Sequence, residues 1–336
     1  MKLRVGVLGL GDQWERRYAP ALRALGDRFE VRAVCEQVAH RAEQAAEQFQ
    51  ATAVDGFRTL ARREDLDAVL ILAPQWYGPL PILAACESGK AIYCAAGMDL
   101  DPDEVRTVKQ RVEAAGVAFL CEFPCRQAPA TLRLKELIAT RLGPARLLFC
   151  HRRAAAGQAR ENVPGCSRTH TAVRELIELV DWCRYVVGQE PTGVTGLMHP
   201  SQFEPDREDY QMMSLDFSPA DRPGTGAIAQ ISYGRYVPAD WREAIGYRPP
   251  AELQVSCERG IAFVDLPASL VWFDEAGRHQ ESLDSERPVG EQLLSHFYRA
   301  ATGSACKSCD LEDAYRAVTI VELARCSHRE GRRMVL

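Results

Sequence analysis

Residues 3–11 read LRVGVLGLG, an apolar run that ends in two glycines separated by one leucine. A run of this kind predicts a short buried β-strand. Gly9 then permits a tight turn, and Gly11 lets the backbone approach a pyrophosphate held by the amides at the start of a helix. A strand, a glycine turn and a helix in this order predict the first part of a dinucleotide-binding fold.

The loop departs from the usual G-x-G-x-x-G pattern at its last position. The third glycine would be residue 14, which is Trp14 in this chain. Because that glycine normally allows the helix to pack closely on the strand, we expect the indole either to point elsewhere or to push the helix away. The motif is weakened, but its first two glycines remain.

An acidic residue follows the second apolar run. Glu36 stands at the end of the strand predicted over residues 31–35. A carboxylate at this place accepts the ribose hydroxyls of NAD and repels the 2′-phosphate of NADP. Gln37 comes next, where an NADP-binding protein would often place a cation. We therefore expect NAD rather than NADP, and the ordinary alternative is a solvent-exposed acid at a strand end.

Strand and helix patterns alternate through the first third of the chain. Apolar runs such as 66–73 and 91–94 are separated by helical patterns such as 80–87. Strands that are apolar on both faces and alternate with helices predict a parallel sheet covered on both sides. Between residues 191 and 283 the pattern changes to short strands with frequent Gly, Pro and Asp, which favours a largely antiparallel sheet.

We predict an α/β chain of two domains. Residues 1–122 form a Rossmann domain with a doubly wound parallel sheet, and residues 123–336 form an α+β domain with a mostly antiparallel sheet. Helices predicted over residues 291–302 and 311–327 close the chain, and we expect that they can pack back on the Rossmann domain.

The composition excludes several classes of protein. The 336 residues are 46% hydrophobic and 26% charged, which is typical of a soluble globular protein. The net charge of −5 gives no indication of a nucleic-acid or membrane-surface partner. No apolar stretch approaches the roughly 20 residues of a spanning helix, and the start of the chain does not resemble a signal peptide. We therefore expect a cytoplasmic protein.

The 12 cysteines invite a disulfide or zinc interpretation, but their placement favours neither. Most lie inside apolar strand or helix patterns, where a reduced cysteine is a small hydrophobe. Cys306 and Cys309 have the spacing of a metal-binding pair, but a zinc ribbon needs a second such pair and the chain has none. We predict no metal site and prefer a thiol-lined surface loop to a redox role for this pair.

Longer stretches resemble the Gfo/Idh/MocA oxidoreductase family, which includes glucose–fructose oxidoreductase and inositol dehydrogenase. Residues 66–94, LDAVLILAPQWYGPLPILAACESGKAIYC, resemble the family's T-P-N-like turn, helix and following strand. RLKELIATRLGPARLLF at 133–149 resembles its linking helix and first strand of the second domain, and LIELVDWCRYVVGQEP at 176–191 resembles its active-site helix. The closing helices also match, so the resemblance spans nearly the whole chain.

The resemblance implies a large, open sheet in the second domain, through which members often associate, and a nicotinamide at the cleft between the domains. We accordingly expect a homodimer or homotetramer and a small-molecule substrate such as a sugar or polyol. The cofactor is expected to be NAD. The residues expected to bind it are Gly9, Gly11, Asp12, Gln13, Glu36, Ala73, Pro74, Gln75, Tyr77 and Ala95.

Two residues that usually carry proton transfer in this family are replaced here. The lysine of the E-K-P motif corresponds to Ala96, and the histidine of the H-x-x-D motif corresponds to Glu178, while Asp181 matches its aspartate. None of the five lysines of the chain belongs at the carboxyl end of a predicted strand, where ligands bind in open α/β sheets. The residues therefore argue against lysine catalysis.

Other groups are candidates for the chemistry. Glu178 would be a general base if burial raised its pKa, and Asp181 on the same helix face would act in the same direction. Arg126, which follows the fifth strand, completes the predicted catalytic set. His170, Arg174 and Trp76 are predicted to face the substrate, and for each of these residues the alternative is an ordinary structural role.

Three functions remain open. The first is an NAD-dependent oxidoreductase with altered acid–base groups, since hydride transfer is the chemistry of the cofactor. The second is a catalytically silent family member, acting as a nucleotide- or metabolite-binding sensor or as a partner subunit. The third is an NAD-assisted elimination or hydrolysis of a sugar derivative, for which Glu178 and Asp181 would serve as acid and base.

Overall fold

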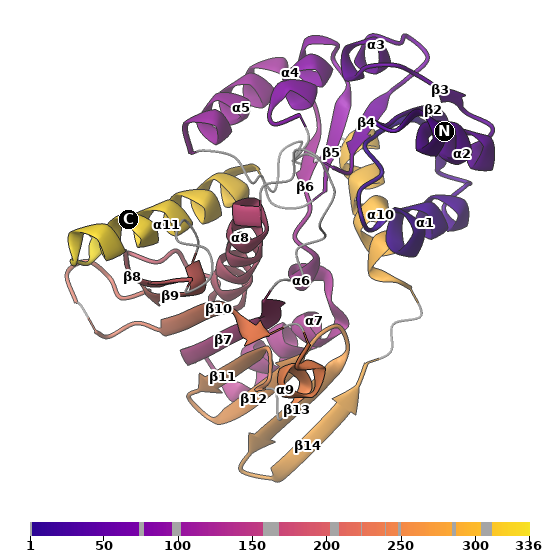
Figure 1. The fold of residues 1–336 in the computed structure, drawn as a ribbon. Helices are drawn as coiled ribbons and strands as arrows, with labels where there is room; N and C mark the ends of the chain where they lie inside the picture. Colours follow the sequence, from indigo (N-terminus) through magenta and orange to yellow (C-terminus); the bar gives the residue numbers. More distant parts are fainter. Residues whose placement is uncertain are drawn as a thin grey trace. The chain divides into compact units, whose positions relative to one another are not determined.

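The chain divides into two compact units, each described by itself (Figure 1). Unit 1 consists of Met1–Pro124 and Glu286–Val318, and unit 2 of Cys125–Ser285 and Thr319–Leu336. The computed structural model describes residues 2–73, 77–95, 102–156, 168–201, 208–222, 224–238, 240–247, 250–283, 287–303 and 311–336, without the side chains of residues 156, 168–171, 242 and 245.

Unit 1 is built on a parallel sheet. Its strands are β1 (Leu3–Leu8), β2 (Phe29–Cys35), β3 (Thr52–Ala53), β4 (Ala68–Ile71), β5 (Ala91–Cys94) and β6 (Phe119–Cys121). Its helices are η1 (Trp14–Tyr18), α1 (Ala19–Ala24), α2 (Ala39–Phe49), α3 (Phe57–Ala61), α4 (Leu80–Glu87), α5 (Pro102–Ala115), α10 (Val289–Thr302) and the first part of α11 (Leu311–Glu330). Among the described residues the sheet order is β3-β2-β1-β4-β5-β6, the order of a Rossmann fold.

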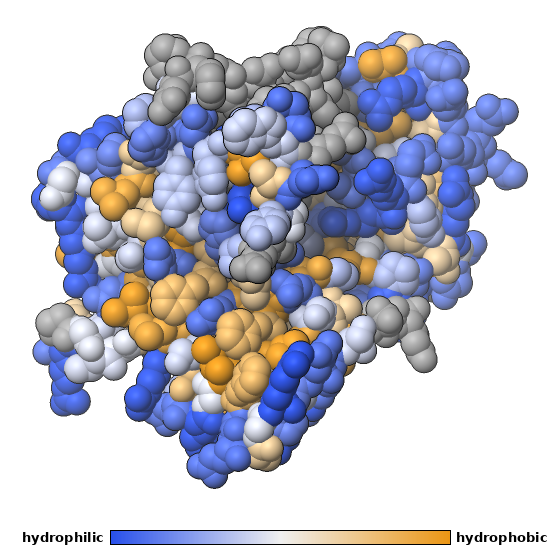
Figure 2. Space-filling model, turned by 60° about the horizontal axis from the view of Figure 1, so that its bottom comes forward, coloured by the Kyte–Doolittle hydropathy of each residue, from blue (hydrophilic) through white to orange (hydrophobic). Residues whose placement is uncertain are grey.

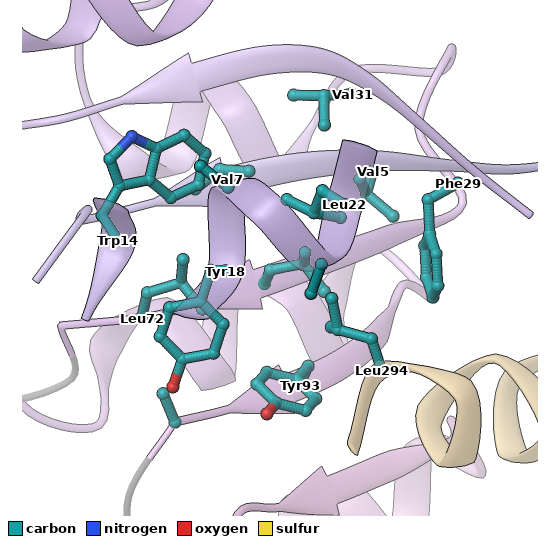
Figure 3. Close-up of a cluster of buried hydrophobic side chains, with 14 of the residues drawn as sticks. Val5, Val7, Trp14, Tyr18, Leu22, Phe29, Val31, Leu72, Tyr93 and Leu294 are labelled. Atoms are coloured by element: carbon teal, nitrogen blue, oxygen red, sulfur yellow. The ribbon is translucent and has the colours of Figure 1, made fainter. Parts of the chain in front are cut away.

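The strands of unit 1 are buried on both faces, as the continuous apolar runs predict. In β1, Val5 and Val7 are fully buried, and all four residues of β4 are buried. Figure 3 shows Val5 and Val7 packed beside Trp14, Leu22 and other residues of the helices that cover one face. Helix α10 belongs to the same core, to which it contributes Leu293, Leu294 and Phe297.

Trp14 changes the helix that follows the glycine loop. Its indole is 2% exposed and packs against Phe49 of α2, with the ring centroids 5.7 Å apart. The turn that carries Trp14 is a π-helix, in which the Gln13 carbonyl accepts from the amides of both Arg17 (2.8 Å) and Tyr18 (3.3 Å). The wider turn makes room for the bulky side chain inside the core, where a glycine would allow a tight α-helical start.

Unit 2 is built on a mixed sheet. Its strands are β7 (Ala145–Ala156), β8 (Gly193–Pro200), β9 (Glu208–Asp216), β10 (Ile228–Pro238), β11 (Leu253–Cys257), β12 (Gly260–Asp265), β13 (Ser269–Asp274), β14 (Gly277–Ser282) and β15 (Met334–Val335). Its helices are α6 (Pro124–Gln127), α7 (Pro129–Leu137), η3 (Ile138–Leu142), α8 (Arg168–Val187), α9 (Arg242–Gly246) and the rest of α11. In the described part of the chain the order is β14-β13-β12-β11-β7-β10-β9-β8-β15, and only β7 and β10 pair in parallel.

The two faces of this sheet differ. One face carries residues such as Leu148 and Cys150 of β7, which are 1% exposed, and α8 packs on β7 and β10. The other face exposes apolar side chains: Leu147 (42%), Phe149 (41%) and Ile228 (41%). Figure 2 shows apolar residues gathered over this part of unit 2. The sheet is therefore covered on one face and open on the other.

The predicted fold class is confirmed, while several element boundaries differ. Several elements were not expected from the sequence: the short β3, β14 and β15, the strand β8, and the helices α3 and α9. The strand predicted over residues 66–73 is shorter, because only Ala68–Ile71 pair with their neighbours. The predicted domain boundary after residue 122 stays a prediction. No helix in the described residues is long and apolar enough to cross a membrane.

Candidate functional site

The two glycines of the loop are required by its geometry. Gly9 has a φ of +67° and Gly11 a φ of +61°, conformations that L side chains rarely adopt. A Cβ on Gly9 would lie 2.7 Å from the Ala73 Cβ, and one on Gly11 would lie 2.8 Å from the Leu72 carbonyl oxygen. The loop is a cradle that a side chain would fill, and it lies at the carboxyl end of β1, where this type of fold binds a dinucleotide.

Glu36 lies next to this loop. Its side chain leaves the end of β2 and is buried, with 8% of the residue exposed. One carboxylate oxygen accepts from the Leu10 amide (2.8 Å) and the other from the Gln37 amide (2.9 Å). Both oxygens have further lone pairs, so the carboxylate keeps the capacity to accept ribose hydroxyls. The residues present therefore fit NAD.

Tyr77, in the loop after β4, lies near Glu36. Its ring packs against Phe57 at the start of α3, with the centroids 5.4 Å apart. Burial, together with the nearby Cys35 and Glu36, raises the pKa of the phenol. The phenol therefore stays neutral beside the acid. Sequence reasoning missed Phe57, whose only signal was an aromatic residue directly after Gly56.

The other predicted cofactor residues are placed as follows. Ala73 is fully buried against Gly9, and Ala95 is 3% exposed, with its amide donating to the Ile71 carbonyl (2.9 Å). Asp12 is exposed, and Gln13 precedes η1 and caps its first turn. Pro74, Gln75 and Trp76 lie outside the described residues, as do Ala96, Cys306 and Cys309.

A buried carboxylate lies in unit 1 beyond the glycine loop. Glu122 follows β6 and is 1% exposed. It accepts from the hydroxyls of Tyr18 (2.5 Å) and Tyr93 (3.0 Å) and forms an ion pair with Arg17. These bonds tie the helix after the glycine loop to the ends of β5 and β6. Sequence reasoning missed this cluster, although an acid directly after an apolar strand was its signal.

In unit 2, Asp181 is held by two arginines. The carboxylate is 1% exposed and makes a two-pronged interaction with Arg126, whose Nε lies 2.6 Å from Oδ2. Arg184, one helical turn further along α8, lies 3.5 Å from Oδ1 and also binds Glu190 through two hydrogen bonds. The Arg126 guanidinium also lies over the Tyr185 ring, 5.3 Å from its centroid. Asp181 and Arg126 are thus brought together, in a buried ion pair.

Glu178 lies one turn before Asp181 on α8, with 11% of its side chain exposed. One oxygen is 3.3 Å from Arg152 of β7, and the other is 3.9 Å from Arg174. Positive partners at these distances favour the charged form of a carboxylate. From the sequence, Asp181 was the one neighbour expected to raise the pKa of Glu178, but Asp181 is itself paired with Arg126 and Arg184.

Arg152 is the residue that sequence reasoning missed in this unit. It faces Glu178, forms an ion pair with Glu175, and lies 3.6 Å from Glu252. Burial opposes its charge, but these carboxylates raise its pKa above the usual value. The pKa of Glu252 is itself raised, chiefly by burial. The available signal was a charged residue on the inward-facing side of a strand, a position that requires a partner.

The remaining predictions for this unit concern Arg174 and His170. Arg174 is 40% exposed at its side chain and stands next to Glu178. His170 lies in the first turn of α8, and its side chain is outside the described residues. Among the described residues, no cluster of His, Cys, Asp and Glu side chains could hold a metal ion.

Comparison with known proteins agrees with this geometry. Residues 3–123 match the profile of the oxidoreductase family with an NAD-binding Rossmann fold, GFO_IDH_MocA. Over 99% of this chain and 95% of its own length, inositol 2-dehydrogenase from Rhodococcus erythropolis is 25% identical. The Rossmann domain over residues 3–123 belongs to the Gfo/Idh/MocA family. The aldose–aldose oxidoreductase of Caulobacter crescentus has the same fold, with a TM-score of 0.82, 16% identity and full coverage of both chains.

Other relatives are matched over shorter segments. D-xylose 1-dehydrogenase (NADP(+)) 2 from Haloferax volcanii is 30% identical over 41% of this chain. The match covers 42% of that relative's length, and the match to another curated relative covers 55% of its length. The chain therefore spans about half the length of these two relatives.

Three of the five lysines, all in the described residues, are engaged elsewhere. Lys90 lies before β5 and donates to the Leu66 carbonyl (2.7 Å), at the amino edge of the sheet. Lys135 donates to the Tyr185 carbonyl (2.9 Å) at the end of α8, and Lys109 pairs with Glu113. None of these three lysines lies at the carboxyl end of a strand in the described part of unit 1.

Proposed function

We propose that this protein is an NAD-dependent oxidoreductase that transfers a hydride between the nicotinamide and a sugar, polyol or related small molecule. The observation that carries the proposal is the cradle of Gly9 and Gly11 with the Glu36 carboxylate bonded to its Leu10 amide. NAD supplies the hydride chemistry when bound, and the residues of the chain have to bind it, orient it and handle one proton.

The preference for NAD rests on the charge of the two residues that follow β2, Glu36 and Gln37. Glu36 is an acid that accepts ribose hydroxyls and repels a 2′-phosphate, and Gln37 carries no charge to balance that repulsion. The Haloferax relative is NADP-dependent by its name, so the preference for NAD rests on the residues of this chain. The acid at this position supports NAD here.

We assign the proton-handling role to Glu178. It lies on α8 at the position of the histidine that the resemblance implies for proton transfer, with 11% of its side chain exposed, Arg152 at 3.3 Å and Arg174 at 3.9 Å. Asp181 and Arg126 are held in a buried ion pair, so a positioning role for α8 fits them better than contact with substrate. Arg174, His170 and Trp76 remain proposed substrate-facing residues.

The proposed substrate class rests on the names of relatives that include a xylose dehydrogenase and inositol dehydrogenases. Both act on polyhydroxylated rings. A carboxylate such as Glu178 with flanking guanidinium groups can accept and donate hydrogen bonds to neighbouring hydroxyls, as a polyol requires.

Two measurements test the proposed function. Titration with NADH, followed by nicotinamide fluorescence and melting temperature, is expected to give saturable binding. NAD-dependent oxidation of a panel of aldoses and cyclitols is then expected for at least one compound and is expected to fall by about 100-fold or more in Glu178→Gln, the scale of a general base. Binding without turnover of any compound would instead favour a silent sensor, and full activity of Glu178→Gln would remove the assignment of Glu178.

We also propose that the protein works as a homodimer or homotetramer in the cytoplasm. The open face of the unit 2 sheet, with Leu147, Phe149 and Ile228 exposed, supports self-association (Figure 2). Nine cysteines in the described residues are free and eight of these are buried, which supports a reducing compartment.

A further inference from the structure

Arg235 of β10 is a buried cation, with 7% of the residue exposed. Among the described residues, no carboxylate lies within ion-pair distance of its guanidinium and no acceptor lies within hydrogen-bond distance. Burying a charge without a partner is costly, so a buried arginine is expected to meet an anion. The position therefore points to an anion that the described residues do not supply.

The neighbours of Arg235 show to which face of the sheet its side chain belongs. A Cβ on Gly234 would lie 2.5 Å from the Tyr236 ring and 3.0 Å from the Tyr210 ring, and the centroids of these two rings are 6.2 Å apart. Gly234 and Tyr236 therefore share one face, on which Tyr236 is 49% exposed. Because successive side chains of a strand alternate, Arg235 lies on the opposite face.

Polar residues stand in register on the face of Arg235. Tyr233, two residues earlier in β10, pairs with Arg152 of β7 on one side and with Gln211 of β9 on the other. Residues paired in register point to the same face, and Arg152 lies 3.3 Å from Glu178 of α8, so this is the face that α8 covers. Gln211 and Arg235 are diagonal neighbours on paired strands, a relationship in which Cα atoms lie about 7–8 Å apart.

Gln211 supplies a second unsatisfied group on this face. The residue is 1% exposed, and its Nε2 donates to Glu208 at 3.4 Å. Its Oε1 is buried without a hydrogen-bond partner, which is rare and costly in a folded protein. An amide oxygen accepts a proton donor such as a hydroxyl and does not bind an anion. Together, Arg235 and Gln211 therefore fit a ligand that carries both an anionic group and a hydroxyl.

Arg152 shows how the chain treats the other arginine of this row. Glu175, Glu178 and Glu252 all lie within ion-pair distance of Arg152, so its charge is neutralised within the protein. Arg235 thus offers one free positive charge in a planar fork, which matches the charge and the geometry of one carboxylate. A phosphate dianion would need a second cation, and Arg152 is already engaged.

We propose that the substrate is an acidic sugar or polyol, whose carboxylate binds Arg235 and one of whose hydroxyls donates to Gln211 Oε1. This inference rests on the proposed oxidoreductase function and narrows its substrate class. Arg235 and Gln211 are binding residues in this proposal, and proton handling stays with Glu178.

The test compares compounds that differ at one carbon, which is either a carboxylate or a hydroxymethyl group: D-gluconate with D-glucitol, and D-galacturonate with D-galactose. D-Glucose 6-phosphate is the phosphate probe. Calorimetry measures binding to the NADH-loaded full chain, and NAD-dependent oxidation gives kcat and KM. The variants are Arg235→Met, Arg235→Lys and Gln211→Leu. The matched control is Arg146→Met, which removes an arginine of β7 whose side chain is 67% exposed.

We expect the wild type to bind the acid of at least one pair about tenfold or more tightly than its neutral counterpart. Arg235→Met is expected to remove this preference by raising Kd and KM for the acid. Arg235→Lys is expected to keep part of it, since lysine keeps the charge but not the fork. Gln211→Leu is expected to weaken both members of a pair alike, and Arg146→Met to change neither.

Melting curves without ligand separate a binding role from a structural one. Arg235→Met removes a charge that has no partner among the described residues, so its melting temperature is expected to equal or exceed that of the wild type. A clear fall in melting temperature, with the preference for the acid unchanged, would show that Arg235 is structural and would overturn the proposal.

Other outcomes overturn the proposal in distinguishable ways. If the neutral compounds bind and are oxidised as well as the acids, the proposed function stands and the acidic substrate class is wrong. Tighter binding of D-glucose 6-phosphate than of either acid, lost in Arg235→Met, would replace the carboxylate with a phosphate. If the folded wild type does not bind NADH, the proposed function fails, and calorimetry of the acids with the protein alone still decides whether Arg235 binds a carboxylate.

Discussion

Glu36 accepts a hydrogen bond from the backbone amide of Leu10, with 2.8 Å between Oε2 and the nitrogen. The acid at the end of β2 and the turn of the glycine loop are therefore one structural feature. A change at Glu36 alters both the charge beside the ribose and the support of the loop.

The first prediction concerns this bond. Glu36→Ala leaves the buried Leu10 amide without its acceptor, which is expected to cost about 1–3 kcal/mol of unfolding free energy. The same variant is expected to weaken NADH binding by about tenfold or more, since a hydrogen bond to a charged group contributes about 1.5–3 kcal/mol. Urea unfolding and NADH titration measure the two effects. Glu30→Ala, an exposed glutamate of the same strand, is the control and should change neither.

The second prediction concerns the residue in the third-glycine position. Trp14 is 2% exposed and packs on Phe49, so Trp14→Ala is expected to cost about 3–5 kcal/mol by leaving a cavity between η1 and α2. Trp14→Phe keeps most of this packing and should cost much less. Equilibrium denaturation of the full chain measures the unfolding free energy of both variants. Equal stability of Trp14→Ala and the wild type would show that the indole is not needed in the core.

The fold could be predicted from the sequence wherever one physical rule dominated. Continuous apolar runs such as β1 and β5 indicate strands buried on both faces, so their alternation with helices predicted a covered parallel sheet, while the strand order came from the structure. The π-turn at Trp14 could not be predicted. The sequence was compatible with two ways of accommodating the indole, a displaced helix or a side chain that points elsewhere. The structure uses a third, a wider first turn.

Part of the candidate site could also be predicted, because the strand pattern fixes where the strand ends lie. Glu36 follows from its position in the motif, since strand ends in parallel sheets are fixed by the pattern. The partners of Glu178 and Asp181 were not predictable. Arg152 and Arg126 are far from α8 in sequence, and only the packing of β7 and α6 brings their guanidinium groups to these carboxylates.

The third prediction concerns the Asp181–Arg126 pair. Asp181→Asn removes the charge that faces two buried guanidinium groups, and breaking such a pair is expected to cost about 3–5 kcal/mol. Glu281→Gln is the matched control, since Glu281 binds Arg133 through two hydrogen bonds in the same unit but both side chains are 28% exposed. The control should cost no more than about 1 kcal/mol. A similar loss for both variants in urea unfolding would contradict a structural role for Asp181.

The fourth prediction concerns the open sheet face. Leu147→Glu places a charge on this face of β7, where it would be desolvated in a dimer, so it is expected to shift the protein towards the monomer. Size-exclusion chromatography with light scattering measures the mass. Leu132→Glu is the control, because Leu132 is an equally exposed leucine (43% against 42%) but lies on α7 rather than on the sheet. Equal masses for the two variants would remove this face as the interface.

The last prediction concerns pH. His151 of β7 hydrogen-bonds through Nδ1 to Ser232 of β10 (2.7 Å), and burial, with Arg153 nearby, lowers its pKa below 6.5. The unfolded chain therefore binds the proton more readily, so the stability that depends on neutral His151 is present above pH 6.5 and is lost as the pH falls towards the folded-state pKa. In His151→Gln, the loss of unfolding free energy at low pH that is due to protonation of His151 should disappear. Urea unfolding at about pH 7.5 and about pH 5.5 measures the difference, with the exposed His40→Gln as control. If His151→Gln loses as much stability between these two pH values as the wild type does, protonation of His151 does not contribute to the acid sensitivity of unit 2.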